Sequence, residues 1–378
     1  MKKIAIILAV AALAACTKSA VEYDSPSEIG FNVVGGNITK AVVDGTTYPT
    51  TLNMYVNAYV QDNDIPETPD YIYKGEFTHR GPYNTIVTTA TDATDVWGGS
   101  TPYYWPNEQK LNFSGFSKAG NVADILGDVT YNPSTDVLYI PSYSPGIGTN
   151  EGANDLMWFQ STKYVQNTGY GKATTYVPVN MYHTCSWITF MVQGDSATGG
   201  TSSTYNITKL TMNGVDMTGS VTCTGNAALA ALTLPTYVVW SDNTTQTGDN
   251  TTYNVTLPDG GVSLSNTYTA TTANGTTTVT QTPKNIETAA TTTTGGNVVV
   301  IPQVPGTIDL EWTYKSSTNA SISDSATGLS LKVSDIADDN VWKPGVHYIY
   351  TITIKANEIL VAPTPVDWTD GSFNVTVE

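Results

Sequence analysis

Short segments in which apolar and polar residues alternate recur along the whole chain, and they constrain its fold more than any other feature. Examples are "LNMYVNAYV" (52–60), "KLNFSGFS" (110–117) and "VHYIYTITI" (346–354), and Gly, Pro, Asn or Asp interrupts nearly every interval between such segments. A period of two places one apolar row on one face of a β-strand, and beyond residue 15 no long window has the period of 3.6 that a helix requires. The sequence therefore predicts an all-β fold.

The alternating segments fall into two series. The chain has 378 residues, which is long for one compact unit, and the second series begins after Tyr176. Many short strands separated by turns are typical of β-sandwiches. We therefore predict two β-sandwich domains in tandem, at residues 37–176 and 177–378. The Thr-rich stretch 263–296 is either a long exposed hairpin or an irregular loop.

The N-terminus has the pattern of a lipoprotein export signal. Two lysines precede an apolar run at 4–15 that is too short to span a bilayer. The run ends in Leu-Ala-Ala-Cys, where small residues fit the lipoprotein signal peptidase and the Cys16 thiol accepts lipid. We predict a signal peptide at 1–15, a lipid anchor on Cys16, and a tether with an N-terminal strand at 16–36. The alternative is an ordinary secretion signal followed by a chance cysteine.

Acidic charge excludes one class of partner. The formal net charge is −17 and the pI is about 4.3. Such a surface repels phosphate backbones, so we expect no nucleic-acid partner. The other two cysteines, Cys185 and Cys223, either pair in a disulfide, which export would allow, or remain buried thiols.

The sequence offers no set of residues with the spacing of a catalytic or cofactor site. The three histidines lie far apart, at His79, His183 and His347. His183 and Cys185 are two residues apart, which on a strand gives parallel side chains and not a nucleophile–base pair. The acidic stretches 62–70 and 335–340 match no calcium loop, and phosphate-binding and nucleophile-elbow motifs are missing. We expect no enzyme activity, no cofactor and no metal.

Aromatic residues suggest a different hypothesis, a sugar-stacking platform. Its candidates are Tyr103, Tyr104 and Trp105, or Trp158 and Phe159. On alternating strands such rings more often pack in the core. A monomeric surface lipoprotein that binds a glycan or host ligand is the alternative to the function inferred below.

Four segments, taken in order, resemble the fimbrillin family, the lipoprotein-derived pilins of the type V pilus in Gram-negative gut and oral bacteria. They are an aromatic-Trp-Pro segment with the strand after it (103–117), an Asp-Leu-Met segment (155–161), a strand whose central His precedes an apolar run (177–192), and a Trp-x-Pro-Gly turn with its strands (341–368). The resemblance covers most of the mature chain. It implies two transthyretin-like Greek-key β-sandwich domains and a structural subunit of a cell-surface fimbrium that supports adhesion.

The resemblance also implies an assembly mechanism. In this family the lipid-anchored precursor reaches the outer membrane, and a trypsin-like protease cuts after an N-terminal strand. The groove that opens is filled by the C-terminal strand of another subunit. The implied partners are other pilin subunits, in a homopolymer or a heteromeric pilus, the outer membrane through the lipid, and a host or bacterial surface ligand. The ten residues after Trp368 favour a stalk subunit, with a tip adhesin left open.

The chain has a candidate for each strand of this exchange. Phe31 and Val33 belong to the N-terminal strand that would be displaced. In the donor segment 369–378, alternate residues form an apolar row, at Phe373, Val375 and Val377. If this segment instead pairs within its own domain, the protein is the monomeric alternative.

The processing site is expected between Lys40 and Ala41. The family's site commonly has Arg, so Lys40 requires a protease with broader trypsin-like specificity. The alternative is that Lys40 is a solvated residue at the end of a strand.

Overall fold

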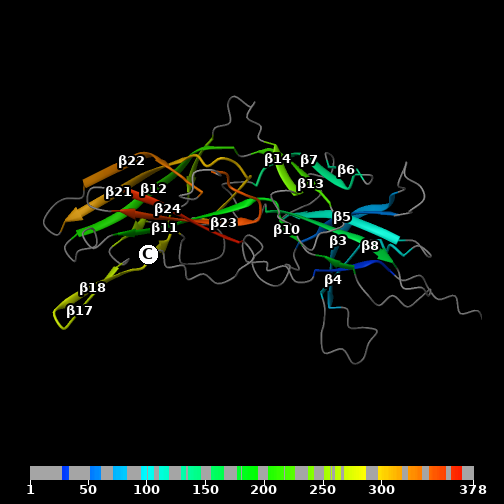
Figure 1. The fold of residues 1–378 in the computed structure, drawn as a ribbon, viewed down its shortest axis with the longest axis horizontal. Helices are drawn as coiled ribbons and strands as arrows, with labels where there is room; N and C mark the ends of the chain where they lie inside the picture. Colours follow the sequence, from blue (N-terminus) through cyan, green and yellow to red (C-terminus); the bar gives the residue numbers. More distant parts are fainter. Residues whose placement is uncertain are drawn as a thin grey trace, which may run out of the picture.

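The computed structural model of the chain is all-β (Figure 1). It describes residues 28–33, 52–60, 71–82, 95–99, 101–105, 110–118, 129–132, 135–145, 155–165, 177–179, 181–194, 203–216, 218–225, 237–241, 251–255, 257, 260–264, 268–286, 297–316, 322–333, 340–354 and 359–367. These residues form five sheets whose neighbouring strands are mostly antiparallel. Within these ranges no helix is long and apolar enough to cross a bilayer. The all-β prediction is confirmed.

The first sheet has eight strands and curls until the strand at one end contacts the strand next to the other end. Its order is β10 (Tyr182–His183), β8 (Leu156–Val165), β5 (Lys110–Lys118), β2 (Met54–Val60), β3 (Tyr71–Pro82), β4 (Asp95–Gly99), β1 (Gly30–Val33) and β9 (Val177–Val179). Neighbours are antiparallel except β1 and β9, which are parallel. Because β9 also contacts β8, the strands from β8 round to β9 close a ring.

Period-two alternation places one apolar row of each strand on the inner face of this ring. On β2 the residues Met54, Val56 and Ala58 point into the ring, where they are buried with Leu111 and Phe113 of β5. The opposite face of the same strands is also covered near the start of β8, because Phe116 and Trp158 belong to a second core. The ring therefore packs on both of its faces.

Two five-stranded sheets form the later part of the chain, at the left of Figure 1. One contains β19 (Lys284–Asn285), β11 (Ser186–Gly194), β23 (Val346–Ile354) and β24 (Ile359–Asp367), with β20 (Asn297–Val300) also on β11. The other contains β15 (Thr251–Val255), β12 (Ser203–Val215), β21 (Thr307–Ser316) and β22 (Ile322–Ser330), with β16 (Val262–Ser263) also on β12. One apolar core, which includes Phe190, Leu210, Leu310 and Tyr350, lies between them.

A four-stranded sheet connects the two parts. Its order is β14 (Val238–Ser241), β13 (Gly219–Thr224), β7 (Val137–Tyr143) and β6 (Thr130–Asn132). Its buried residues share a core with Trp158 of the curled sheet and Val299 of β20. Strands from both sides of residue 176 thus lie in this sheet, and the division into 37–176 and 177–378 stays a prediction.

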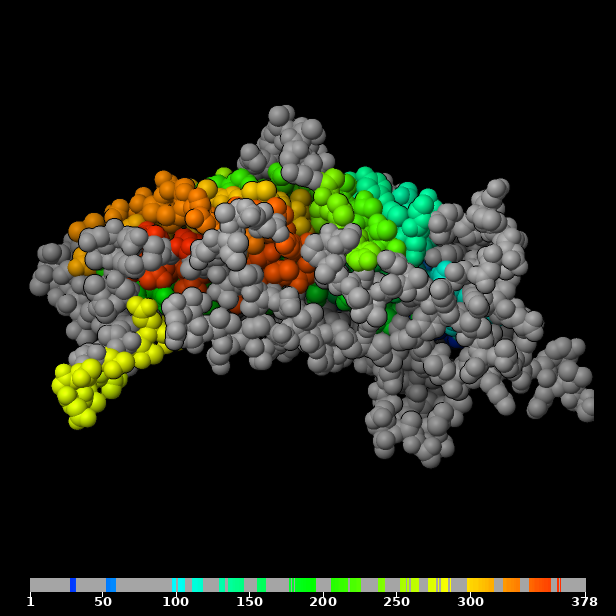
Figure 2. Space-filling view, viewed as in Figure 1, coloured from blue at the N-terminus to red at the C-terminus, as the bar shows by residue number. Residues whose placement is uncertain are grey.

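A two-stranded hairpin projects from the body (Figure 2, yellow). Its strands are β17 (Tyr268–Ala273) and β18 (Thr276–Gln281). Asn274 and Gly275 between them have positive φ angles of 53° and 78°, as the tight turn of a two-residue hairpin loop requires. Of the two forms expected for the Thr-rich stretch, residues 268–281 adopt the exposed hairpin.

Candidate functional site

The strand β1 lies inside the curled sheet and is paired along both of its edges. It pairs antiparallel with β4, at Trp97 and Gly98, and parallel with all three residues of β9. Immediately before it, the Ile29 N–H donates to the Tyr103 carbonyl oxygen at 2.7 Å. Main-chain hydrogen bonds therefore hold this short strand from two sides, which is the position of a central strand and not of an edge.

Phe31 fills an aromatic socket in the ring. Its side chain is fully buried and meets Phe113 edge-to-face, with the ring centroids 5.1 Å apart and the planes at 88°. The Phe159 centroid lies 6.1 Å away. Ile29, two residues earlier on the same face, is also fully buried. Two alternate residues, Ile29 just before β1 and Phe31 within it, thus place their side chains in the same core.

The walls of this socket are held by contacts that do not involve β1. The Trp97 indole Nε1 donates to the Leu52 carbonyl oxygen at 2.9 Å, and Trp105 packs edge-to-face on Phe113 at 5.8 Å. Removal of β1 would leave a slot between β4 and β9, with unpaired main-chain groups on both sides and an apolar socket between them. Such a slot favours the binding of another strand.

The structure describes only some of the residues that the sequence singled out. Phe31 belongs to the core inside the ring, and the backbone of Val33 pairs with Val179. Six other candidate positions lie outside the described residues: the lipidation residue Cys16, the processing pair Lys40 and Ala41, and the donor row Phe373, Val375 and Val377. Their roles therefore stay predictions.

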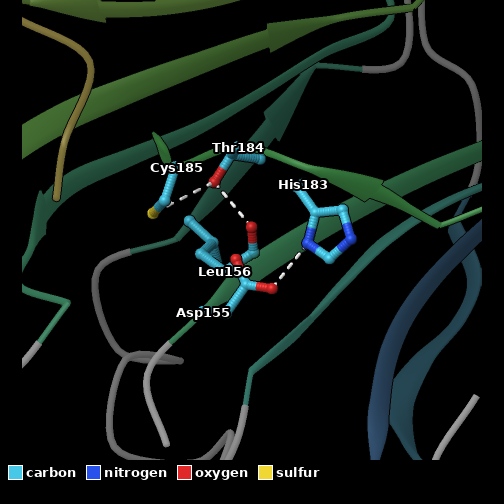
Figure 3. A network of polar contacts seen from close by, with 5 residues as sticks. All are labelled: Asp155, Leu156, His183, Thr184 and Cys185. Atoms are coloured by element: carbon cyan, nitrogen blue, oxygen red, sulfur yellow. Dashed lines mark hydrogen bonds and ion pairs between the residues drawn. The ribbon is translucent and has the colours of Figure 1, made fainter. Parts of the chain in front are cut away.

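A polar cluster lies where the curled sheet meets the later sheets (Figure 3). His183 Nδ1 is 2.6 Å from Asp155 Oδ2, and both side chains are buried. The next residue, Thr184, bonds to the Leu156 carbonyl oxygen through both its backbone N–H, at 2.9 Å, and its Oγ1, at 2.7 Å. These contacts fix the start of β8 against the segment that leads into β11, so the cluster is a structural joint.

The Cys185 thiol in this joint is not an activated nucleophile. In Figure 3 it points away from His183, and Sγ lies 3.9 Å from Thr184 Oγ1. Burial and the Asp155 carboxylate raise the pKa of the Cys185 thiol, which disfavours the reactive thiolate. Burial likewise raises the pKa of Cys223. Both cysteines are free thiols, so of the two alternatives left by the sequence the structure has the unpaired one.

The other two histidines lie in β23 and β3. His347 stacks on Trp187, with centroids 3.6 Å apart, and its Nε2 lies 2.7 Å from Thr189 Oγ1. Of His79 only the backbone is described, in β3. Among the described residues, no three His, Cys, Asp or Glu side chains could hold a metal ion, and the acidic stretches 62–70 and 335–339 lie outside that part of the chain.

The rings proposed as a sugar platform are mostly core residues. Trp158 and Phe159 are buried, and Trp105 packs against Phe113, while Tyr104 is exposed. A platform on Trp158 and Phe159 is wrong, because the two rings point to opposite faces of β8 and each face is covered by a core. Of the other set, Trp105 is buried and Tyr104 is exposed. Sequence reasoning missed Phe113 and Phe159 as the walls of the Phe31 socket, since only strand order brings these residues together.

Comparison with known proteins assigns the family. The model of the fimbrillin-like family matches residues 71–368, which is more than half of the chain. The chain belongs to the fimbrillin-like family. Its members are structural fimbrial and adhesion proteins, so this fimbrillin-like chain is a structural protein and not an enzyme. Both β1 and the segment after Trp368 lie outside the matched residues, so their roles must be argued from this chain alone.

Solved structures similar to this fimbrillin-like chain include three fimbrial proteins. A fimbrial protein from Bacteroides vulgatus is 15% identical over 90% of this chain and 99% of its own, with a TM-score of 0.49. A fimbrial assembly protein from Parabacteroides distasonis is 11% identical (89% and 95%, TM-score 0.41). The C-terminally truncated tip fimbrial protein Mfa3 from Porphyromonas gingivalis is 9% identical (90% and 100%, TM-score 0.38). No curated protein sequence matches the chain.

Proposed function

We propose that the chain is a pilin-like structural subunit of a cell-surface fimbrium and that it assembles by exchanging β1 for the C-terminal segment of another subunit. The observation that carries this proposal is the position of β1. It is short, it is paired on both sides, and it fills an aromatic socket whose walls other residues hold. A strand of this kind can be replaced by another with the same pattern without rebuilding the rest of the sheet.

The donor segment repeats the sequence of the strand that it would replace. Residues 31–33 read Phe-Asn-Val, and residues 373–375 also read Phe-Asn-Val. With these triplets superimposed, Phe373 takes the place of Phe31, and Asp370 takes that of Glu28, another acid. This match supports a donor that runs in the same direction as β1, parallel to β9 and antiparallel to β4.

The direction of β1 favours exchange between molecules. The strand β24 ends beside Val346, next to Gly345, whose N–H donates to the Cys185 carbonyl oxygen at 2.8 Å in the joint. β1 runs towards the same joint, parallel to β9. To enter the β1 slot of its own subunit in this direction, the donor segment would first have to run the length of β1 and then turn back. Residues 368–372 would have to make this connection, and they span at most ~18 Å. A second subunit can supply the strand from the far end.

The remaining parts of the proposal concern export, domains and assembly. Lipidation of Cys16 would anchor the precursor in the outer membrane, and cleavage between Lys40 and Ala41 would release β1 before the chain enters the fimbrium. The two parts of the molecule would be transthyretin-like Greek-key sandwiches in tandem. The partners would be other pilin subunits, in one or several kinds, and adhesion to a surface ligand would be a property of the assembled fimbrium.

The test compares three purified forms: the full chain, the chain that starts at Ala41, and the latter without residues 372–378. Only the form that starts at Ala41 and keeps its tail should give a ladder of oligomers on gels run without boiling. Within it, Phe373→Ala should weaken the ladder, and Thr376→Ala, on the other side of the alternation, should not. Absence of any ladder, together with a less stable monomer after tail deletion, would favour the monomeric alternative.

A further inference from the structure

The strand β24 forms a long edge of its sheet. It pairs antiparallel with β23 through all nine of its residues, from Ile359 opposite Ile354 to Asp367 opposite Val346, and the register has no shift. Among the described residues it has no partner strand on its other side. Such an edge would ordinarily offer a row of N–H and C=O groups to any extended chain.

Two prolines interrupt the donors of this edge. Pro363 lies opposite Tyr350 and Pro365 opposite Tyr348. In an antiparallel pair, residues alternate between those that exchange hydrogen bonds with the partner and those whose N–H and C=O groups face away. A proline has no N–H and would break the ladder if it faced β23. Because the ladder is unbroken, the main-chain nitrogens of Pro363 and Pro365 face away from β23. Two of the five positions that face outwards therefore have no N–H to donate.

The other long edge among the described residues of the later sheets is interrupted in a different way. In β22 the register shifts between Leu329, opposite Ile308, and Ala326, opposite Leu310. Gly328, at the shift, has φ of +66° and turns its N–H to Asp309 Oδ1 at 2.8 Å. A bulge bends an edge strand and makes it a poorer template for strand addition.

We propose that Pro363 and Pro365 close the edge of β24 to strand addition by a second copy of this chain. The edge of β24 can accept hydrogen bonds, but it cannot complete an antiparallel ladder with a neighbour. A second copy therefore cannot extend this sheet sideways. One further consequence rests on the proposed function: a donor strand finds continuous partners in the β1 slot and not on β24, so subunits add end to end without branching at this edge.

The experiment uses the full chain, in which β1 still fills its slot, so that strand exchange plays no part in the result. The double variant Pro363→Thr/Pro365→Thr restores two outward N–H groups. Each restored hydrogen bond tightens pairing by roughly 2- to 10-fold, so two of them should raise the self-association constant by roughly 4- to 100-fold. Sedimentation velocity measures this change. Hydrogen exchange should show new protection of the β24 amides in the associated form.

The matched control is Val361→Thr, at a position whose main-chain N–H already faces outwards, so the change adds no donor. Its side chain packs against the core between the two sheets, so the variant also reports any effect of lost packing, and it should leave association unchanged. The single variants Pro363→Thr and Pro365→Thr provide the test if the double variant does not fold, and each should give part of the increase. The proposal is overturned if folded variants associate no more than the wild-type chain, or if the wild-type chain already pairs through β24. Neither outcome would affect the exchange of β1, which the tail-deletion experiment tests separately.

Discussion

The strands β1 and β24 lie near opposite ends of the described chain and differ in how the fold uses them. β1 has four residues, is paired on both sides, and accounts for the core position of Phe31. β24 has nine residues, is paired with β23 alone among the strands that the structure describes, and has two prolines at outward positions. The short strand thus occupies a site that another strand could fill, and the long strand ends its sheet.

This difference shows that the length of a strand does not decide where another subunit can bind. What decides it is the set of groups that the absence of a strand would expose. Loss of β1 would uncover two rows of main-chain groups and an aromatic socket, so a replacement strand gains both hydrogen bonds and buried apolar area. A strand added to β24 would find donors missing at Pro363 and Pro365.

Of the substitutions that test this comparison, Phe31→Ala should have the largest effect on stability. It removes a fully buried ring from contact with Phe113 and Phe159 and leaves a cavity, which should lower the free energy of unfolding by about 3–5 kcal/mol. Urea unfolding of the full chain measures the loss. Val239→Ala, at an exposed position, is the control and should change stability by less than ~0.5 kcal/mol. A loss below ~1 kcal/mol for Phe31→Ala would mean that β1 contributes little to the core.

Acid should weaken the sheet of β24 more than the sheet of β1. Burial lowers the pKa of His347, opposite Val366 of β24, from 6.5 to about 3. The folded state thus keeps the imidazole neutral, while the unfolded chain binds a proton below pH 6.5. The contribution of His347 to stability is complete above pH 6.5 and is lost as the pH falls towards 3, by about 2–3 kcal/mol between pH 6.5 and 4.5.

Denaturant unfolding of the wild-type chain and of His347→Gln at several pH values checks this expectation. The carboxylates contribute equally to both proteins, so the difference in slope reports His347 alone. Hydrogen exchange at pH 4.5 should show β23 and β24 losing protection before β4 and β5. Equal pH slopes for the two proteins would contradict the assigned role of His347.

Adding a methyl group at Gly115 should displace Phe159, a wall of the socket that holds Phe31. A Cβ at this position would press on the Tyr55 carbonyl oxygen and lie 2.5 Å from the Phe159 ring, which itself packs against Phe31. We expect Gly115→Ala to cost about 1–3 kcal/mol, because backbone on one side prevents relaxation. Thermal unfolding measures the effect. Gly260→Ala separates steric crowding from backbone strain, because a Cβ at Gly260 would have open space around it while the φ of +83° strains any residue other than glycine.

An exposed ion pair remote from both strands should have the smallest effect. Lys209 Nζ lies 2.9 Å from Glu311 Oε1, and about half of each side chain is exposed. We expect Lys209→Ala to cost at most about 1 kcal/mol at low salt, and less at high salt. A double-mutant cycle with Glu311→Ala measures the coupling. A larger coupling would show that surface charge adds to stability on the scale of the strand contacts.

Much of the fold was predictable because alternation is a local property. Residues such as Val56 and Ala58, or Ile188 and Phe190, predict strands by themselves, and the structure places them in strands with the apolar row buried. The neighbours of each strand were not predictable in the same way. The order that puts β1 between β4 and β9 joins residues near positions 31, 97 and 177, and no local pattern encodes such pairings.

The candidate site shows the same limit. Phe31 was singled out from its place in an alternating segment, and its burial agrees with that expectation. Phe113 and Phe159 were not recognised as its neighbours. For Trp158 and Phe159 the sequence left a surface platform and the core as alternatives, and both rings are in the core. Aromatic residues on strands do not reveal by sequence which face of the sheet is covered, because here both faces of the curled sheet pack against a core.

The sequence by itself determined that this chain forms strands, that its surface is acidic, and that it resembles the fimbrillin family, since these depend on residue type and short-range spacing. The tertiary structure decided that β1 is central and that β24 is an edge whose prolines face outwards. Those facts depend on which strands lie side by side. Main-chain hydrogen bonds are the same for every residue but proline, so the pairing is selected by how all the side chains pack together.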